Sequence, residues 1–106
     1  VLWYNDGHQG INLNTLCILG RKYYDRFGYI YHNDYISLFC DNEFTEVSKR
    51  LNKAVYNSLC IIEHQHWAWG YGKMDDLYKK NEVYIAADRD TFNRRLSIGF
   101  ELPIAA

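Results

Sequence analysis

Apolar positions along the chain follow two spacings, which predict short strands alternating with helices. Val1 to Tyr4 is apolar and ends at Asn5-Asp6-Gly7, so the pattern predicts a short strand followed by a turn. From Asn12 to Gly28 the apolar residues recur every three or four positions, which predicts a helix with Asn12 as its N-cap and Gly28 at its C-terminal end.

A second helix is predicted directly after Asp41-Asn42. Its apolar residues fall on one stripe, and a carboxylate and a guanidinium four residues apart form an ion pair on the opposite face. The stripe is Phe44, Val47 and Leu51, and the pair is Glu46 and Arg50.

The near-continuous apolar run from Ala54 to Ile62 predicts a strand buried on both faces. Farther along, Asp88 or Asp90 is expected to cap a last helix that ends before Pro103. The order strand, helix, helix, strand, helix indicates an α/β fold, a small mixed sheet with flanking helices, in a single domain over residues 1–106.

The strands are few for such a sheet. We therefore expect the domain to be part of a larger one, or to self-associate through an uncovered strand edge or apolar face. The chain also opens on Val1, in the middle of a predicted strand, which favours a piece of a longer protein.

Composition excludes several classes of function. Apolar residues make up 48% of the chain and charged residues 24%, typical of a globular domain, and the net charge of -1 gives no basic surface for nucleic acid or an anionic membrane. No apolar run approaches the roughly 20 residues that span a bilayer. Three widely spaced cysteines predict buried thiols in a reducing compartment, so we expect the protein in the cytoplasm.

Two carboxylates, Asp41 and Glu43, stand at the start of the second predicted helix. Acidic side chains are common there because they stabilise the helix N-terminus. A carboxylate held rigidly at a helix mouth can equally serve as a general base for an attacking hydroxyl. The local sequence leaves both interpretations open, and also leaves open which acid is the base.

Two histidines, His64 and His66, follow the second predicted strand, and alternate residues of an extended segment share a face. They could meet one metal ion, with His32 or Cys60 as further ligands, although paired histidines on exposed loops are common. The loop then continues with three aromatic residues, Trp67, Trp69 and Tyr71, which suit either the stacking of sugar rings or a plug over the core.

The order of these signals resembles family-2 glycosyltransferases of the GT-A fold. In that family an aromatic residue and an acidic pair precede a helix ending in Arg-Leu, followed by a strand and a His. Phe39 to Ala54 is similar to this segment, with Arg50-Leu51 at the helix end and His64 after the strand. The resemblance extends over roughly Trp3 to His66.

This resemblance implies the C-terminal, acceptor-side half of an inverting enzyme that moves a sugar from a nucleotide-diphosphate donor to a hydroxyl acceptor. Asp41 or Glu43 would deprotonate the acceptor, and His64 would help to hold a divalent metal, Mn or Mg, against the diphosphate. The family's nucleotide-binding half has no counterpart in these 106 residues, so we expect them to be inactive alone.

A different class of function also fits the aromatic residues. A non-catalytic carbohydrate- or protein-binding module would use Trp67, Trp69 and Tyr71, and would not need Asp41 and Glu43.

Overall fold

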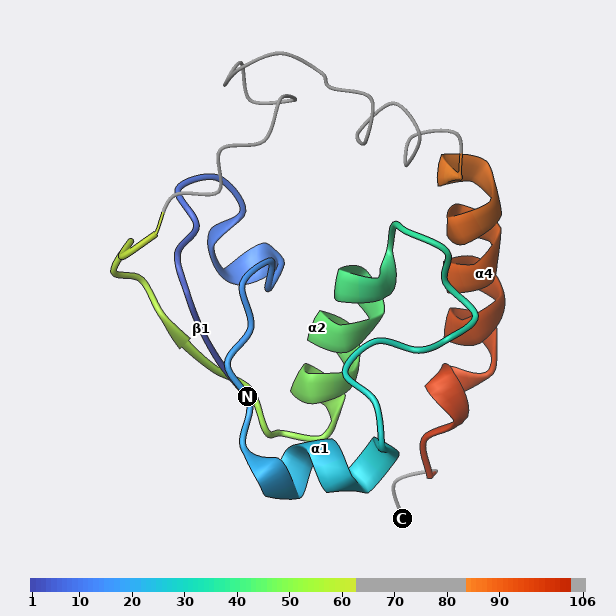
Figure 1. Ribbon diagram of the computed structural model, residues 1–106, viewed down its shortest axis with the longest axis horizontal. Helices are drawn as coiled ribbons and strands as arrows, with labels where there is room; N and C mark the ends of the chain where they lie inside the picture. Colours follow the sequence, from blue (N-terminus) through green and yellow to red (C-terminus); the bar gives the residue numbers. More distant parts are fainter. Residues whose placement is uncertain (63–83, 104–106) are drawn as a thin grey trace.

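The computed structural model of the chain describes residues 1–62 and 84–103. Within them the predicted order of strand, helix, helix, strand, helix is confirmed (Figure 1). The elements are β1 (Leu2–Tyr4), the 3-10 turn η1 (Gly10–Asn12), α1 (Arg21–Phe27), α2 (Cys40–Arg50), β2 (Val55–Asn57), α4 (Ile85–Ser97) and the 3-10 turn η3 (Gly99–Glu101).

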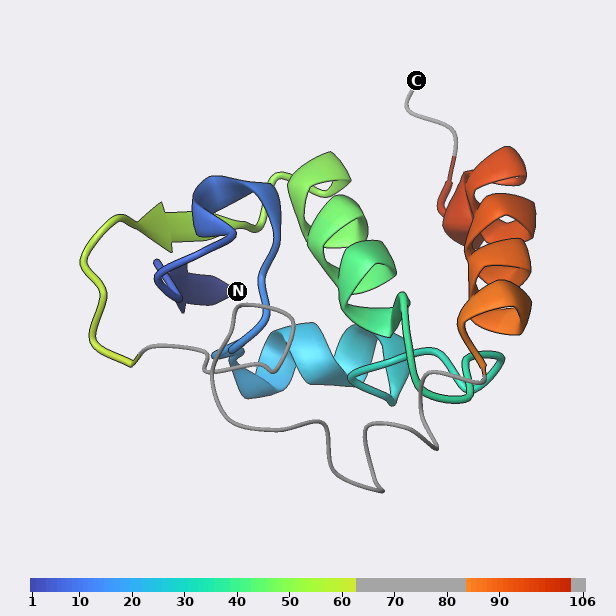
Figure 2. The same cartoon turned by 90° about the horizontal axis from the view of Figure 1, so that it is seen from above.

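The two strands form a small parallel sheet, in which Trp3 lies opposite Tyr56. On the other side of β1, the Leu2 and Ile18 backbones exchange two N–H···O bonds of 2.7 and 2.9 Å in an antiparallel bridge. The connection between the parallel strands contains α2, which lies between the sheet and α4 (Figures 1 and 2). The described residues therefore form a small mixed α/β fold.

The ends of three secondary-structure elements lie at one end of the molecule. The carboxyl ends of β1 and β2 and the amino end of α2 all point toward the same end of the molecule (Figure 1). In α/β proteins the crevice at the carboxyl ends of parallel strands is where ligands bind.

The apolar core has two parts. Beside the sheet, the buried Trp3 packs against Tyr56 with ring centroids 5.3 Å apart, and its indole N–H donates to the Gly10 carbonyl at 3.2 Å. Between the helices, Phe44 and Val47 of α2 are buried together with Phe100 of η3. The predicted stripe on the second helix is thus confirmed for these two of its residues.

A buried ion pair joins the two long helices. The Arg95 side chain of α4 is 1% exposed and its Nε donates to the Glu43 carboxylate of α2. The Tyr35 hydroxyl donates to the same oxygen, Glu43 Oε1, at 3.0 Å. Burial is the largest single effect and opposes the charge of Arg95, but the hydrogen bond to Glu43 and the negative charges of Glu43 and Glu101 together outweigh it and raise the pKa of the guanidinium. Arg95 therefore stays charged.

A second buried carboxylate holds the loop before α2. Asp88 of α4 is fully buried, and its two oxygens accept the backbone N–H groups of Ile36, Ser37 and Leu38 at 2.6–2.8 Å. The prediction that Asp88 or Asp90 caps the last helix is wrong, because α4 begins at Ile85 with Tyr84 as its N-cap. Asp88 instead binds main chain far away in the sequence.

The first predicted helix is much shorter than its periodicity suggests. Asn12 ends η1 instead of capping a helix, and α1 covers only Arg21–Phe27. The intervening segment is drawn to the sheet edge, where Ile18 bridges β1. Gly28 ends α1 in the left-handed conformation, with φ of 76°, as predicted.

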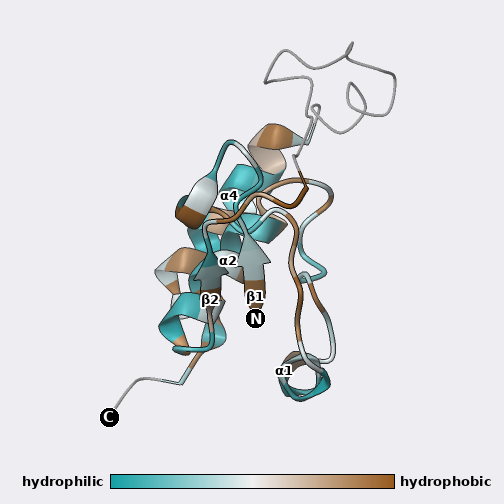
Figure 3. Cartoon of the chain, turned by 90° about the vertical axis from the view of Figure 1, so that its left-hand side faces the viewer, coloured by the Kyte–Doolittle hydropathy of each residue, from teal (hydrophilic) through white to brown (hydrophobic). Residues whose placement is uncertain are grey.

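The apolar run from Ala54 to Ile62 is also not a buried strand. Only Val55–Asn57 pairs with β1, and Val55 is 61% exposed. The described residues that directly follow β2, 58–62, stay outside the core, with Leu59, Ile61 and Ile62 each more than half exposed. Figure 3 views the molecule from the sheet side and shows apolar colour in both strands and in the irregular segments beside them.

We predict that replacing Arg95 with Met lowers the free energy of unfolding by about 3–5 kcal/mol, because Glu43 would be left buried without its cation. Arg94→Met is the matched control: Arg94 pairs with Asp34 at an exposed site where solvent screens the charges, so its loss should lower the free energy of unfolding far less. Urea unfolding followed by circular dichroism measures both.

The double variant Glu43→Met/Arg95→Met separates loss of the pair from loss of packing. Removing both charges together should recover most of the stability lost in Arg95→Met, since no unpaired charge remains buried. A double variant as unstable as the single one contradicts this account.

We also predict that the chain self-associates through the apolar surface around β2. Light scattering at high concentration should give a mass above that of the monomer, and replacing Leu59 and Ile62 with Lys should restore the monomer. Ile98→Lys is the control, because Ile98 is 50% exposed but follows α4, away from the sheet. A monomeric wild-type chain contradicts the prediction.

Candidate functional site

Asp41 lies in the first turn of α2 and is partly exposed. Its Oδ1 accepts the backbone N–H of Asn42 at 3.0 Å, and its carbonyl accepts the Thr45 hydroxyl at 2.8 Å. Thr45 Oγ1 in turn accepts the N–H of Asn14 at 2.9 Å, which ties this turn to the segment between the sheet and α1. Asp41 is thus held on the side of the molecule toward which the carboxyl ends of β1 and β2 point (Figure 1).

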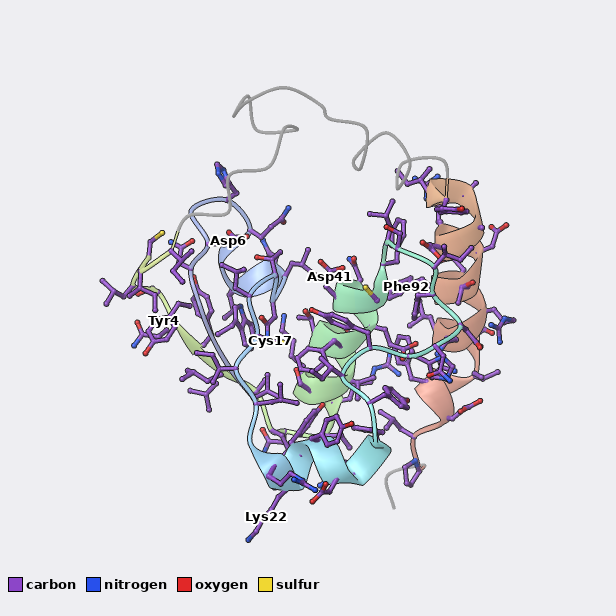
Figure 4. All side chains as sticks on the ribbon, viewed as in Figure 1. Tyr4, Asp6, Cys17, Lys22, Asp41 and Phe92 are labelled. Carbon is purple, nitrogen blue, oxygen red and sulfur yellow. The ribbon has the colours of Figure 1, made fainter. Side chains whose placement is uncertain are left out.

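Asp6, in the loop after β1, lies toward the same end as Asp41 (Figure 4). Its carboxylate is buried and accepts three hydrogen bonds, from the N–H groups of His8 and Gln9 and from the Thr15 hydroxyl at 2.6 Å. These bonds close the predicted turn at Asn5-Asp6-Gly7, where Gly7 has a φ of 91°. Asp6 therefore fixes the course of the loop that follows β1.

Glu43 has surroundings quite different from those of Asp41. It is 5% exposed, and one of its carboxylate oxygens, Oε1, binds both Arg95 and Tyr35. Burial and the neighbouring Glu43 charge raise the pKa of Tyr35, so the phenol stays a proton donor to Glu43. Glu43 therefore serves to hold α2 against α4.

The backbone just before Asp41 is strained. Phe39, the N-cap of α2, has a φ of 63°, a left-handed conformation that is costly for a bulky residue. Its ring is fixed by Phe92 of α4, with centroids 6.0 Å apart, and by the Arg89 guanidinium at 5.7 Å. Strain of this kind often accompanies functional sites, because surrounding contacts must enforce it.

The Asp41 charge acts on two neighbouring groups, the Tyr31 phenol and the Cys40 thiol. Burial, then the nearby thiols Cys17 and Cys40, and then the Asp41 carboxylate raise the pKa of Tyr31. Burial and the Asp41 charge likewise raise the pKa of Cys40 to about 11. Both groups are therefore neutral around pH 7 and do not compensate the negative charge of Asp41.

A groove of about 410 Å³ opens beside the amino end of α2. This volume is within the range of small-molecule sites. Its lining comes from the loop held by Asp88 and from the residue preceding Asp41: Tyr31, His32, Asn33, Tyr35, Ile36, Ser37 and Cys40. By contrast, a partly open cavity of about 20 Å³ beside Phe44, lined mostly by aromatic side chains, has room for about one water molecule.

The predicted aromatic and histidine residues are not located by the structure. Trp67, Trp69, Tyr71, His64 and His66 all lie outside the described residues. Within residues 1–62 and 84–103, no three His, Cys, Asp or Glu side chains form a group that could hold a metal ion. The suggested extra ligands differ in setting, since His32 lines the groove while Cys60 is exposed after β2.

The predicted burial of the cysteines is only partly confirmed. Cys17 and Cys40 are half-buried and Cys60 is exposed, because the run after β2 does not enter the core. All three are free thiols.

Sequence reasoning missed the residues that fix the site from α4. Asp88, Phe92 and Arg95 are spaced by four and three, so they share one helix face, and that spacing was the available signal. Two charged residues on an apolar stripe indicate buried partners elsewhere in the chain.

Comparisons of the chain with protein-family models, with curated proteins and with solved structures find no match. In the part of the chain that the structure describes, no helix is long and apolar enough to cross a membrane.

We predict that Cys40 reacts with iodoacetamide far more slowly than Cys60. With a pKa of about 11, only about one Cys40 thiol in a thousand is ionised at pH 8, whereas Cys60 is exposed. Asp41→Asn should accelerate Cys40, because removing the negative charge favours the thiolate. Peptide mass spectrometry over time gives both rates, and equal rates for the two cysteines contradict the prediction.

Proposed function

We propose that this chain is the acceptor-side portion of an inverting glycosyltransferase, related to the C-terminal half of the GT-A fold. It would transfer a sugar from a nucleotide-diphosphate donor to a hydroxyl acceptor. The observation that carries the proposal is the position of Asp41. This acid belongs to the family-like segment from Phe39 to Ala54, and it stands in the first turn of α2, at the strand-end side of a parallel sheet.

The proposal assigns the general base to Asp41 and a structural role to Glu43. A base must reach the acceptor hydroxyl, and Asp41 is partly exposed at the helix mouth. Glu43 is buried and bound to Arg95 and Tyr35, so using it as a base would break the pair that joins α2 to α4. The different burial of the two acids supports this division.

The proposed reaction is a single displacement. Asp41 takes the proton of the acceptor hydroxyl while the hydroxyl oxygen bonds to the anomeric carbon of the donor sugar. The bond from that carbon to the diphosphate oxygen breaks, and the nucleotide diphosphate leaves with the electron pair. A divalent ion, for which the sequence suggests His64 and His66, would neutralise the leaving diphosphate. Those histidines lie outside the described residues, so only the role of Asp41 is argued from contacts.

The test begins with the coding sequence upstream of Val1 and a protein extended by it. The extended protein should release nucleotide diphosphate from a nucleotide sugar when an acceptor is present. Asp41→Asn should lower the transfer rate by about 10²–10⁴-fold while the fold is retained. An upstream frame that encodes no nucleotide-binding half, or an Asp41→Asn variant with full activity, overturns the proposal.

Glu43→Gln is the matched control for Asp41→Asn. It should lower stability, and each molecule that remains folded should keep most of its transfer activity. The 106-residue chain alone is a second control, since it should not turn over a nucleotide sugar. Detectable transfer by the isolated chain contradicts the assignment of the donor site to another segment.

A further inference from the structure

The groove at the amino end of α2 is lined mostly by neutral polar and aromatic side chains. Two phenol rings, Tyr31 and Tyr35, stand with the imidazole of His32, the amide of Asn33 and the hydroxyl residue Ser37. Among the described residues that line it, none carries a carboxylate, an ammonium or a guanidinium. A phosphate-bearing ligand needs cations or clustered N–H donors, so this lining favours a neutral ligand.

The chemistry of the lining also indicates the shape of that ligand. Aromatic rings offer apolar faces to flat ligands, and neutral amide, hydroxyl and imidazole groups both donate and accept hydrogen bonds. The backbone N–H of Asp34 lies 3.1 Å from His32 Nδ1 and occupies that ring nitrogen, so Nε2 is the imidazole atom left for a ligand. A pyranose ring has both an apolar C–H face and neutral hydroxyls.

The groove is held in place before any ligand arrives. Asp88 binds three consecutive N–H groups of its loop, and Tyr35 is bound through its hydroxyl to Glu43. The Tyr31 ring packs against Phe44 with centroids 5.8 Å apart, yet Tyr31 remains 39% exposed. Such fixed side chains lose little conformational freedom when a ligand binds.

We propose that this groove, with Tyr31 and Asn33 as its principal contacts, binds a neutral pyranose ring and is the acceptor subsite. The assignment to the acceptor rests on the function proposed above. The groove reaches the amino end of α2, since Cys40, the first residue of that helix, lines it, and Asp41 follows Cys40 in the sequence. The acceptor of the reaction is therefore a saccharide, with a hydroxyl directed toward Asp41, and not a lipid or a protein side chain.

Binding to the 106-residue chain tests the groove without any need for transfer. Methyl glucoside, methyl galactoside and methyl mannoside are titrated while saturation-transfer NMR is recorded on their ring protons. At least one should bind, and Tyr31→Ala and Asn33→Ala should each weaken it about fivefold. Tyr31→Phe should keep the stacking contribution. Tyr24→Ala, an exposed tyrosine on α1 outside the groove, should bind as wild type.

Tyr31 contacts the core, so its Ala variant is checked for folding by circular dichroism; Asn33 is exposed and gives a variant that leaves the core intact. The inference is overturned if no pyranoside binds, if binding survives both Ala variants, or if uridine diphosphate displaces the sugar from the groove. Pyranoside binding that Asp41→Asn preserves supports the groove, even if the extended protein shows no transfer. Transfer that is insensitive to Tyr31 and Asn33 retains the proposed function and rejects the subsite.

Discussion

The buried ion pair between Glu43 and Arg95 is the interaction on which the rest of this structure depends. It joins α2 to α4 across 52 positions of sequence, and Tyr35 adds the loop before α2 to the same carboxylate. The described residues include only four buried apolar side chains, so burial of apolar surface contributes little stability beyond what folding requires. The two helices are therefore aligned largely by charges that must stay paired, and the position of Asp41 follows from that alignment.

Asp41 and Glu43 are neighbouring acids with very different burial and hydrogen-bond partners. They are two residues apart on one helix, so they point in different directions, one toward the helix mouth and one toward α4. The polar environment of Asp41 includes Tyr31 and Cys40, both neutral around pH 7. We propose that this separation lets one acid exchange protons while the other keeps the site rigid.

The sequence predicted the elements whose signals are local. The turn at Asn5-Asp6-Gly7, the end of α1 at Gly28, the apolar stripe of α2 and the Glu46–Arg50 pair all depend on neighbours within a few residues. It failed where distant partners decide, as at Ile18, which pairs with β1 instead of continuing a helix. The same holds for the candidate site. The position of Asp41 at a helix start was predicted from local sequence, whereas the groove depends on Asp88, whose hydrogen-bond partners lie about 50 residues away.

The Asp88 carboxylate holds the loop before α2 through that loop's main chain, by accepting the backbone N–H groups of residues 36, 37 and 38. Every amino acid except proline supplies the same N–H group, so the anchor does not depend on which side chains those positions carry. Ile36 and Ser37 both line the groove and can therefore be exchanged while the loop keeps its course. Loop shape and side-chain chemistry are therefore set by different parts of the chain: substitutions of Ile36 and Ser37 would change the groove surface while the contacts from Asp88 still hold the loop.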